Sequence, residues 1–294
     1  MNETLRKILL AGYCTATQPY RRWANVRNFA QGKAPIVVLF YHRIADDRAN
    51  AMTHSNRLFR KQIHWLKRHC EMISLEEAQR RIRSGYNDQL AASITFDDGY
   101  AENCDQAIPL LIEENIPCTY FVSSWQVLGG HPFPHDTASG CHSRPNTPEQ
   151  LRFMAKCGIE IGAHTRTHAD LGRIHDEQQL HDEVVVCGEE LQAVIGKPVR
   201  YFAFPYGLPK NLNTRAFQMA FEYGYEAMCS AYGDYNFGGD DPFHIRRVHA
   251  EDMVRLRNWC TVDPRRLKPR VRYQYELPEP TATLPSDSKK IAER

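Results

Sequence analysis

Seven short runs of apolar and β-branched residues recur along this chain, and most are separated by segments in which apolar residues follow helical spacing. The runs cover residues 36–42, 91–96, 118–122, 159–163, 201–204, 225–230 and 243–248. Strands that alternate with helices pair in parallel through right-handed crossovers. Because a closed ring leaves no exposed sheet edge, seven such units favour a barrel over an open sheet. The pattern therefore predicts an α/β fold, an irregular (β/α) barrel.

The barrel pattern occupies residues 35–262 and predicts a single domain with an extension at each end. Residues 1–34 form the N-terminal extension. Residues 263–294 are interrupted by prolines and end in a polar stretch, so we expect a C-terminal tail that is poorly ordered at its end. Residues 125–148 are rich in Gly, Pro and polar side chains and are too long for a plain connection. They predict a functional loop.

The charge balance argues against nucleic acid as a partner. The chain has 37 Lys and Arg residues against 35 Asp and Glu residues, too even for a protein that neutralises many phosphates. No transmembrane segment is predicted, because the longest apolar run is far shorter than the roughly 20 residues that span a bilayer. Nine scattered cysteines without a Cys-x-x-Cys pair indicate neither a zinc knuckle nor a disulfide framework. We expect a cytoplasmic protein, with export through the short apolar stretch after Lys7 as the alternative.

Polar residues follow several predicted strands at their carboxyl ends, where the functional groups of parallel α/β barrels gather. Asp97 and Asp98 are adjacent carboxylates, which raise each other's proton affinity unless a positive charge compensates. His164 and His168 can face one point if their loop makes a helical turn. Two imidazoles and one carboxylate form the three-ligand site of catalytic zinc, with an open position for water. Each motif in isolation is more often a turn, a cap or a structural histidine, but their combination at strand ends favours a metal site.

Three segments carry a resemblance to a known family. They are TFDDGY at residues 95–100, HTRTHADL at residues 164–171 and FAFPYG at residues 202–207. These resemble the first three motifs of the polysaccharide deacetylases, which are also called the NodB homology or carbohydrate esterase family 4 proteins. The resemblance covers residues 35–260 or so and implies a deformed (β/α)7 barrel that removes acetyl groups from N-acetylated amino sugars.

The resemblance also implies roles for individual residues. Asp97 is the expected general base, while Asp98, His164 and His168 are expected to hold a divalent metal, commonly zinc. The backbone N–H of Tyr206 is expected to stabilise the oxyanion. The implied cofactor is therefore a divalent metal, and the implied partner is an N-acetylated glycan. We also expect Pro205, Tyr206 and Asp136 to contact the substrate, although an aspartate in such a loop more often supports its turn.

Two positions depart from the familiar pattern of the family. The arginine that pairs with the catalytic aspartate is replaced by Ala203, and we predict Arg247 as the substitute because it shares a strand face with Ile245 and His249. The similarity is greatest to the poly-N-acetylglucosamine deacetylases, whose acid-donating histidine follows the first strand, and His42 occupies that place. His249, at the end of the last strand, is the rival acid.

Two other functions stay open at this point. One is an amidohydrolase of the same fold that cleaves another C–N amide bond in a small metabolite. The other is a glycan-binding module without activity, which is disfavoured because the four residues of the expected centre are all present. Basic side chains between residues 57 and 83 could contact an anionic glycan or a membrane surface, although a solvated helix face is the favoured explanation.

Overall fold

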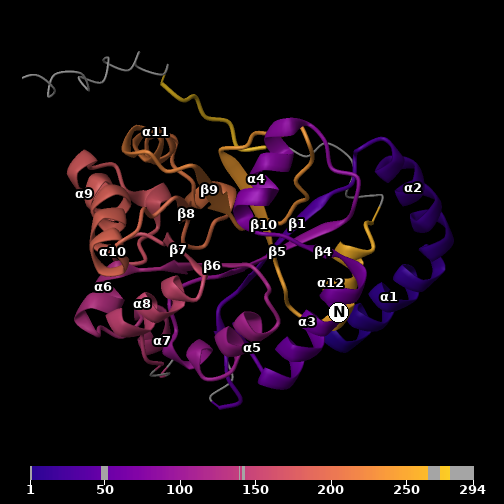
Figure 1. The fold of residues 1–294 in the computed structure, drawn as a ribbon, viewed down its shortest axis with the longest axis horizontal. Coiled ribbons are helices and arrows are strands. Elements are labelled where there is room, and N and C mark those ends of the chain that lie inside the picture. The colour runs from indigo at the N-terminus through magenta and orange to yellow at the C-terminus, as the bar shows by residue number, and fades with distance from the viewer. Residues whose placement is uncertain (1, 48–51, 139, 141–142, 264–271, 279–294) are drawn as a thin grey trace, which may run out of the picture.

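The computed structural model describes residues 2–47, 52–138, 140, 143–263 and 272–278, and within these residues seven strands close into a parallel barrel (Figure 1). The strands are β1 (Ile36–Tyr41), β5 (Ala91–Phe96), β6 (Cys118–Val122), β7 (Glu160–Ala163), β8 (Tyr201–Ala203), β9 (Ala227–Ser230) and β10 (His244–His249). Each pairs in parallel with the next, and β1 pairs with both β5 and β10, which closes the ring. The predicted (β/α)7 barrel is confirmed.

Three strands of two residues each were not predicted. β4 (Glu71–Met72) pairs in parallel with the first two residues of β5, and β2 (Arg43–Ile44) pairs with β3 (Thr53–His54). Two residues are too few to show an alternating pattern in a sequence.

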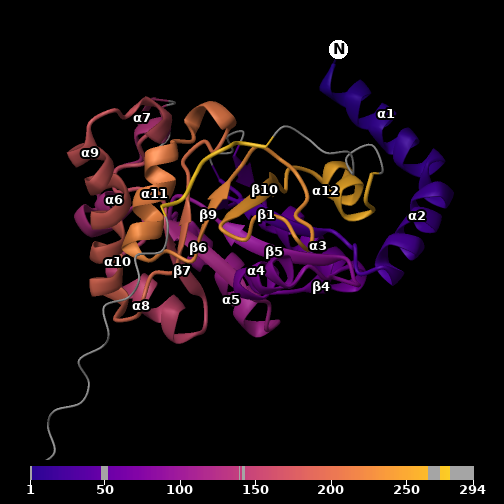
Figure 2. The ribbon, with the colours of Figure 1, turned by 90° about the horizontal axis from the view of Figure 1, so that it is seen from above.

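Helices surround the ring (Figures 1 and 2). They are α3 (Asn56–His69), α4 (Leu75–Ser84), α5 (Ala107–Glu113), α8 (Pro148–Lys156), α9 (Glu177–His181), α10 (Cys187–Ile195), α11 (Thr214–Tyr223) and α12 (Met253–Cys260). Their ends follow capping signals in the sequence. The Ser74 hydroxyl accepts a hydrogen bond from the Glu77 N–H at the start of α4, and Thr147 and Gln150 form a capping box on α8. The apolar stripe between residues 180 and 195 reads as one helix, but a π turn (Asp182–Val186) separates α9 from α10.

The barrel interior follows from the alternation of side chains along each strand. Ile36 and Val38 of β1 pack inside the ring with Ile245 of β10, whereas Val37 and Leu39 face the helices. Positions two and four residues further along a strand continue the same face. The carboxyl ends of the strands therefore direct their inward residues to one place.

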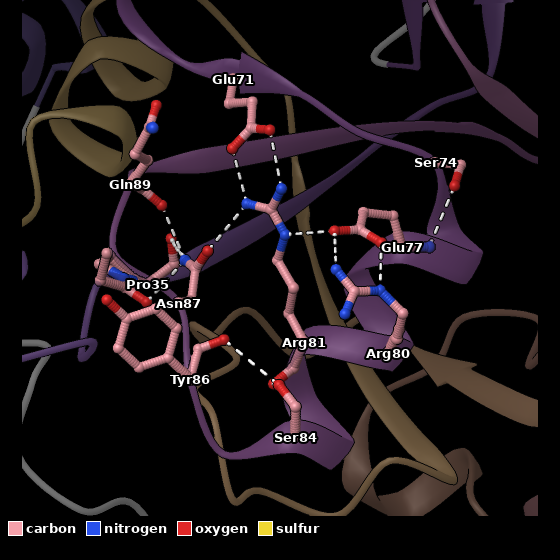
Figure 3. Close-up of polar contacts among 11 residues, drawn as sticks. Pro35, Glu71, Ser74, Glu77, Arg80, Arg81, Ser84, Tyr86, Asn87 and Gln89 are labelled. Atoms are coloured by element: carbon pink, nitrogen blue, oxygen red, sulfur yellow. Dashed lines mark hydrogen bonds and ion pairs between the residues drawn. The ribbon is translucent and has the colours of Figure 1, made fainter.

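The amino end of the barrel is tied together by an ionic network between α4 and β4 (Figure 3). Arg81 donates to both carboxylate oxygens of Glu71 at 2.6 and 2.7 Å and to Glu77 at 2.7 Å, and Arg80 also binds Glu77. The Asn87 amide donates to the Ala34 carbonyl just before β1. Arg80 and Arg81, two of the basic residues between 57 and 83, are therefore paired with carboxylates of the protein itself. This pairing favours a solvated helix face over a site for an anionic partner.

Both extensions dock on the barrel. In the first, α1 (Glu3–Ala16) packs on α12, and the buried Arg21 of α2 (Gln18–Ala30) donates to Asn258 and Thr261 at 2.9 Å each. Part of the expected C-terminal tail is packed as well, because Tyr275 stacks on Phe217 of α11 with ring centroids 3.9 Å apart. Residues 264–271 and 279–294 of that tail lie outside the described residues. Among the helices described, none combines the length and the apolar character needed to cross a bilayer.

Candidate metal centre and active site

Two carboxylates enter the barrel mouth together because the chain turns sharply after β5. Asp97 continues the inward row of Thr95, and Asp98 takes a left-handed conformation with φ of 73°. Gly99 follows with φ of 99°, and its N–H donates to the Asp97 carbonyl at 2.9 Å. The turn explains the glycine, since a residue with a side chain rarely adopts this φ. Both aspartates are buried.

Asp97 is held by a buried arginine. Arg247 donates to its two carboxylate oxygens at 2.6 and 2.9 Å, and also to the Thr95 hydroxyl at 3.1 Å. The guanidinium lies over the rings of Phe40 and Phe121, each 5.1 Å away. Burial opposes the charged carboxylate, but Arg247 outweighs it, so the pKa of Asp97 lies below its ordinary value. The structure thus places Arg247 where the missing motif arginine would act on Asp97.

Asp98 meets the two motif histidines. Its Oδ1 atom lies 3.3 Å from Nε2 of His164 and 3.1 Å from Nε2 of His168, and all three side chains are buried. The Nδ1–H of His164 donates to the Ala203 carbonyl at 2.8 Å, which leaves the lone pair on Nε2 facing Asp98. Oδ1 of Asp98 is buried and accepts no hydrogen bond from any residue that the structure describes. An orphaned carboxylate oxygen between two imidazole nitrogens fits a divalent cation.

The two histidines do not converge through a helical turn, contrary to the expectation from their spacing. The segment between them is an irregular loop in which Thr165 and His168 take left-handed conformations, with φ of 59° and 63°. These two bends bring both imidazoles to one side. The loop follows β7 directly, and the His164 N–H still donates to the Val122 carbonyl of β6. His164 therefore continues the strand pairing and does not begin a helical turn.

The loop is stabilised from the π turn. Glu183 is buried there, and its carboxylate accepts from the N–H of Thr167 at 2.9 Å and from its hydroxyl at 2.6 Å. The Glu183 carbonyl also accepts from the Arg166 N–H at 3.1 Å. π turns inside helices occur frequently at functional sites. Here the turn directs a carboxylate at the loop that carries both histidines, and sequence reasoning missed it.

The two candidate acids, His42 and His249, are neighbours at the carboxyl ends of the paired strands β1 and β10. His42 follows β1, and its carbonyl is fixed by the Asn103 amide at 2.8 Å. Burial lowers the pKa of His42, and the charges of Asp98 and Asp97 oppose that shift. His249 stacks on Phe40 with centroids 5.1 Å apart, and its ring lies 5.9 Å from that of His42. Burial lowers the pKa of His249 to about 3, and the charges of His42 and His54 act in the same direction.

The third motif, residues 202–207, lies beside His168 through the ring of Tyr206. Tyr206 has φ of 61° and an exposed ring whose edge lies against His168 at 5.3 Å, whereas Pro205 is buried. No described residue accepts a hydrogen bond from the Tyr206 N–H. At Gly207 a Cβ atom would meet the Ala231 nitrogen at 2.5 Å, so only glycine fits this turn. Within the described residues, the Tyr206 N–H is thus available to donate to a ligand oxygen.

Comparison with known proteins agrees with this geometry. A family model described as polysaccharide deacetylase matches residues 84–228, which include the two aspartates, the two motif histidines and the third motif. The chain carries a polysaccharide deacetylase domain. This deacetylase domain is 28% identical over 132 residues to a chitooligosaccharide deacetylase of Bradyrhizobium sp. (strain ANU 289), an alignment that covers 43% of this chain and 52% of the relative. The chain spans about half the length of the curated relatives it matches.

Solved structures show the same fold for the deacetylase domain. IcaB from Ammonifex degensii superimposes with a TM-score of 0.64 and 22% identity, over 78% of this chain and 98% of that one. The Streptococcus pyogenes deacetylase PplD, in complex with acetate, superimposes with a TM-score of 0.63 and 18% identity, over 81% and 100% of the two chains. At such identities the likeness concerns the fold.

The long loop of the deacetylase domain contributes a residue that sequence reasoning passed over. The loop contains α6 (Ser124–Gly129) and α7 (Pro134–Ala138), and His135 of α7 directs Nε2 to the Tyr100 hydroxyl at 2.8 Å and to Oδ2 of Asp98 at 3.6 Å. The expected substrate residue is its neighbour Asp136, which is 2% exposed beside Tyr100. That burial favours the turn-supporting role of Asp136. In the sequence, the one feature that could have pointed to His135 was its position next to Asp136.

Proposed function

We propose that this protein is a metal-dependent hydrolase that removes N-acetyl groups from the amino sugars of a poly- or oligosaccharide. The observation that carries the proposal is the pairing of two adjacent carboxylates with different partners. Asp98 faces His164 and His168, whereas Asp97 is taken up by Arg247. The arrangement gives two adjacent residues different roles: Asp98 suits a metal ligand, and Asp97 suits a base that does not bind the metal.

Asp98, His164 and His168 would hold the cation, which we propose to be zinc. When bound, a divalent metal polarises the acetamide carbonyl and makes a nearby water more acidic. The chain supplies the remaining groups. A carboxylate has about four lone-pair sites, so Asp97 can accept a proton while it still binds Arg247. The Tyr206 N–H donates to the carbonyl oxygen of the substrate as negative charge develops there.

The protein can be tested directly on N-acetylated oligosaccharides. We expect mass spectrometry to detect sugars that have lost one acetyl group each after incubation with zinc-loaded protein. Removing the metal with a chelator should abolish the reaction, and adding zinc back should restore it. Activity that survives in the fully chelated protein would contradict the metal site. Cleavage of other amides with none of these glycans deacetylated would contradict the substrate class.

We assign proton donation to the leaving amine to His42, since its ring lies in the field of both aspartates. His42→Ala should lower kcat by about 10²- to 10⁴-fold, the usual contribution of a general acid. His249→Ala should have a smaller effect, because burial lowers the pKa of His249 to about 3 and so leaves its ring uncharged near neutral pH. Steady-state kinetics on one oligosaccharide compare the two variants. If His249→Ala were the more damaging change, the acid would be His249.

A further inference from the structure

The N-terminal helices expose an apolar surface that the barrel does not cover. Thirteen large apolar side chains are exposed among the described residues, and six of them lie in α1 and α2. These six are between 48 and 72% exposed, and they are Leu5, Ile8, Leu9, Tyr20, Trp23 and Val26. Spacings of three and four residues place the members from each helix on one face. Both helices lie at the edge of the molecule opposite α9 and α10 (Figures 1 and 2).

The same segment is strongly basic. Residues 1–34 contain six Lys and Arg residues and a single Glu, a formal charge of +5, although the whole chain carries only +2. Two of these cations are used within the fold, Arg21 in its buried site and Lys7 beside Asp252. The other four are exposed and form no ion pair with any residue in the described ranges. They are Arg6, Arg22, Arg27 and Lys33.

We propose that α1 and α2 bind the surface of an anionic lipid bilayer, with their apolar residues in the headgroup region and their basic residues on the lipid phosphates. Helices that carry Trp, Leu and Ile beside Lys and Arg are typical of this mode of binding, in which the helix lies on the membrane and does not cross it. Trp23 and Tyr20 suit the interface because their rings are apolar with one polar group each. The charge asymmetry of the chain selects an anionic surface over a neutral one.

The second basic region of the chain lacks these properties. Lys67 of α3 is paired with Glu114, and Arg80 and Arg81 of α4 are paired with Glu77. None of the large apolar side chains of α3 and α4 is exposed. This region has charge without an apolar anchor, so we assign the bilayer contact to α1 and α2.

Binding through α1 would bring the membrane near the mouth of the barrel. Leu10 of α1 lines a cavity of about 320 Å³ together with His249 at the carboxyl end of β10. That end of the strand belongs to the face on which the candidate centre lies. The bilayer contact does not depend on the proposed deacetylation, since none of its residues belongs to the centre.

Vesicle sedimentation tests the proposal with the whole 294-residue chain. We expect it to pellet with phosphatidylcholine vesicles that contain phosphatidylglycerol, to pellet much less with phosphatidylcholine alone, and to be released by high salt. Leu9→Ala/Trp23→Ala and Arg22→Glu/Arg27→Glu should each weaken binding by about tenfold or more. The matched controls, Phe153→Ala on α8 and Arg57→Glu/Arg60→Glu on α3, should bind like the wild type.

Several results would overturn the proposal. One is the absence of binding to the anionic vesicles. Another is a loss of vesicle binding in the α3 control as large as that in the α2 variant. Self-association that disappears in the Leu9→Ala/Trp23→Ala variant would assign the surface to a second copy of the chain, as sedimentation velocity would show. Thermal unfolding verifies that each variant is folded. Deacetylation of soluble oligosaccharides, measured on the same samples, separates a failed membrane contact from a failed proposed function.

Discussion

Asp97→Asn should reduce deacetylation by about 10²- to 10⁴-fold while the protein keeps its metal, because the amide cannot accept the proton that a general base removes. Asparagine has nearly the same shape as aspartate and can still accept a hydrogen bond from Arg247 through its oxygen. The measurements are kcat on one N-acetylated oligosaccharide and the metal content after dialysis.

Asp98→Asn is the matched control for this change, since it makes the same chemical substitution one residue further on. Asp98 faces both motif histidines, so its variant should lose metal as well as activity. Equal loss of metal from the two variants would contradict the division of roles between Asp97 and Asp98. Full activity of Asp97→Asn would remove it from the reaction.

Arg247→Met should lower the free energy of unfolding by about 3–5 kcal/mol, because it leaves the Asp97 carboxylate buried without a compensating charge. Methionine retains most of the apolar contact with Phe40 and Phe121. Urea unfolding followed by fluorescence measures the change. The double variant Asp97→Asn/Arg247→Met, in which no charge is left unpaired, should regain a large part of the loss.

Arg81→Met provides the comparison for Arg247. Arg81 also binds a carboxylate through two nitrogens, but its pair with Glu71 is partly exposed at the other end of the barrel (Figure 3). Water can solvate the Glu71 carboxylate once the pair is broken, because that side chain is 38% exposed, so this variant should lose less stability than Arg247→Met. Similar losses in both variants, or a double variant no more stable than Arg247→Met, would show that the buried charge is not the cause.

The parts of the centre that could be predicted are those that strand geometry determines. Residues two apart on a strand share a face, so Arg247 could be placed beside Asp97 from the sequence, and the structure brings them into contact. The seven strands could be predicted because strands that are buried on both faces give continuous apolar runs. The backbone of a loop follows no repeating pattern of this kind, so its course cannot be predicted from residue spacing. The left-handed bends at Thr165 and His168, and the approach of His135 to Asp98, depend on tertiary contacts that spacing does not encode.

The choice between His42 and His249 shows a further limit. Both were placed at strand ends, but their order of distance from the aspartates depends on how β1 and β10 are staggered, with Phe40 opposite His249. A sequence gives the length of each strand more readily than the offset between two neighbours. The kinetic comparison of the two variants tests which histidine donates the proton.

The π turn makes the chain unusually sensitive to length at a site outside the strands of the barrel. Each helical residue turns the chain by about 100°, so one residue fewer between Glu183 and α10 would rotate that carboxylate away from Thr167. The imidazole pair would then lose its support although no ligand had changed. Single-residue insertions and deletions, which most surface helices accommodate at their ends, should therefore be poorly accepted here.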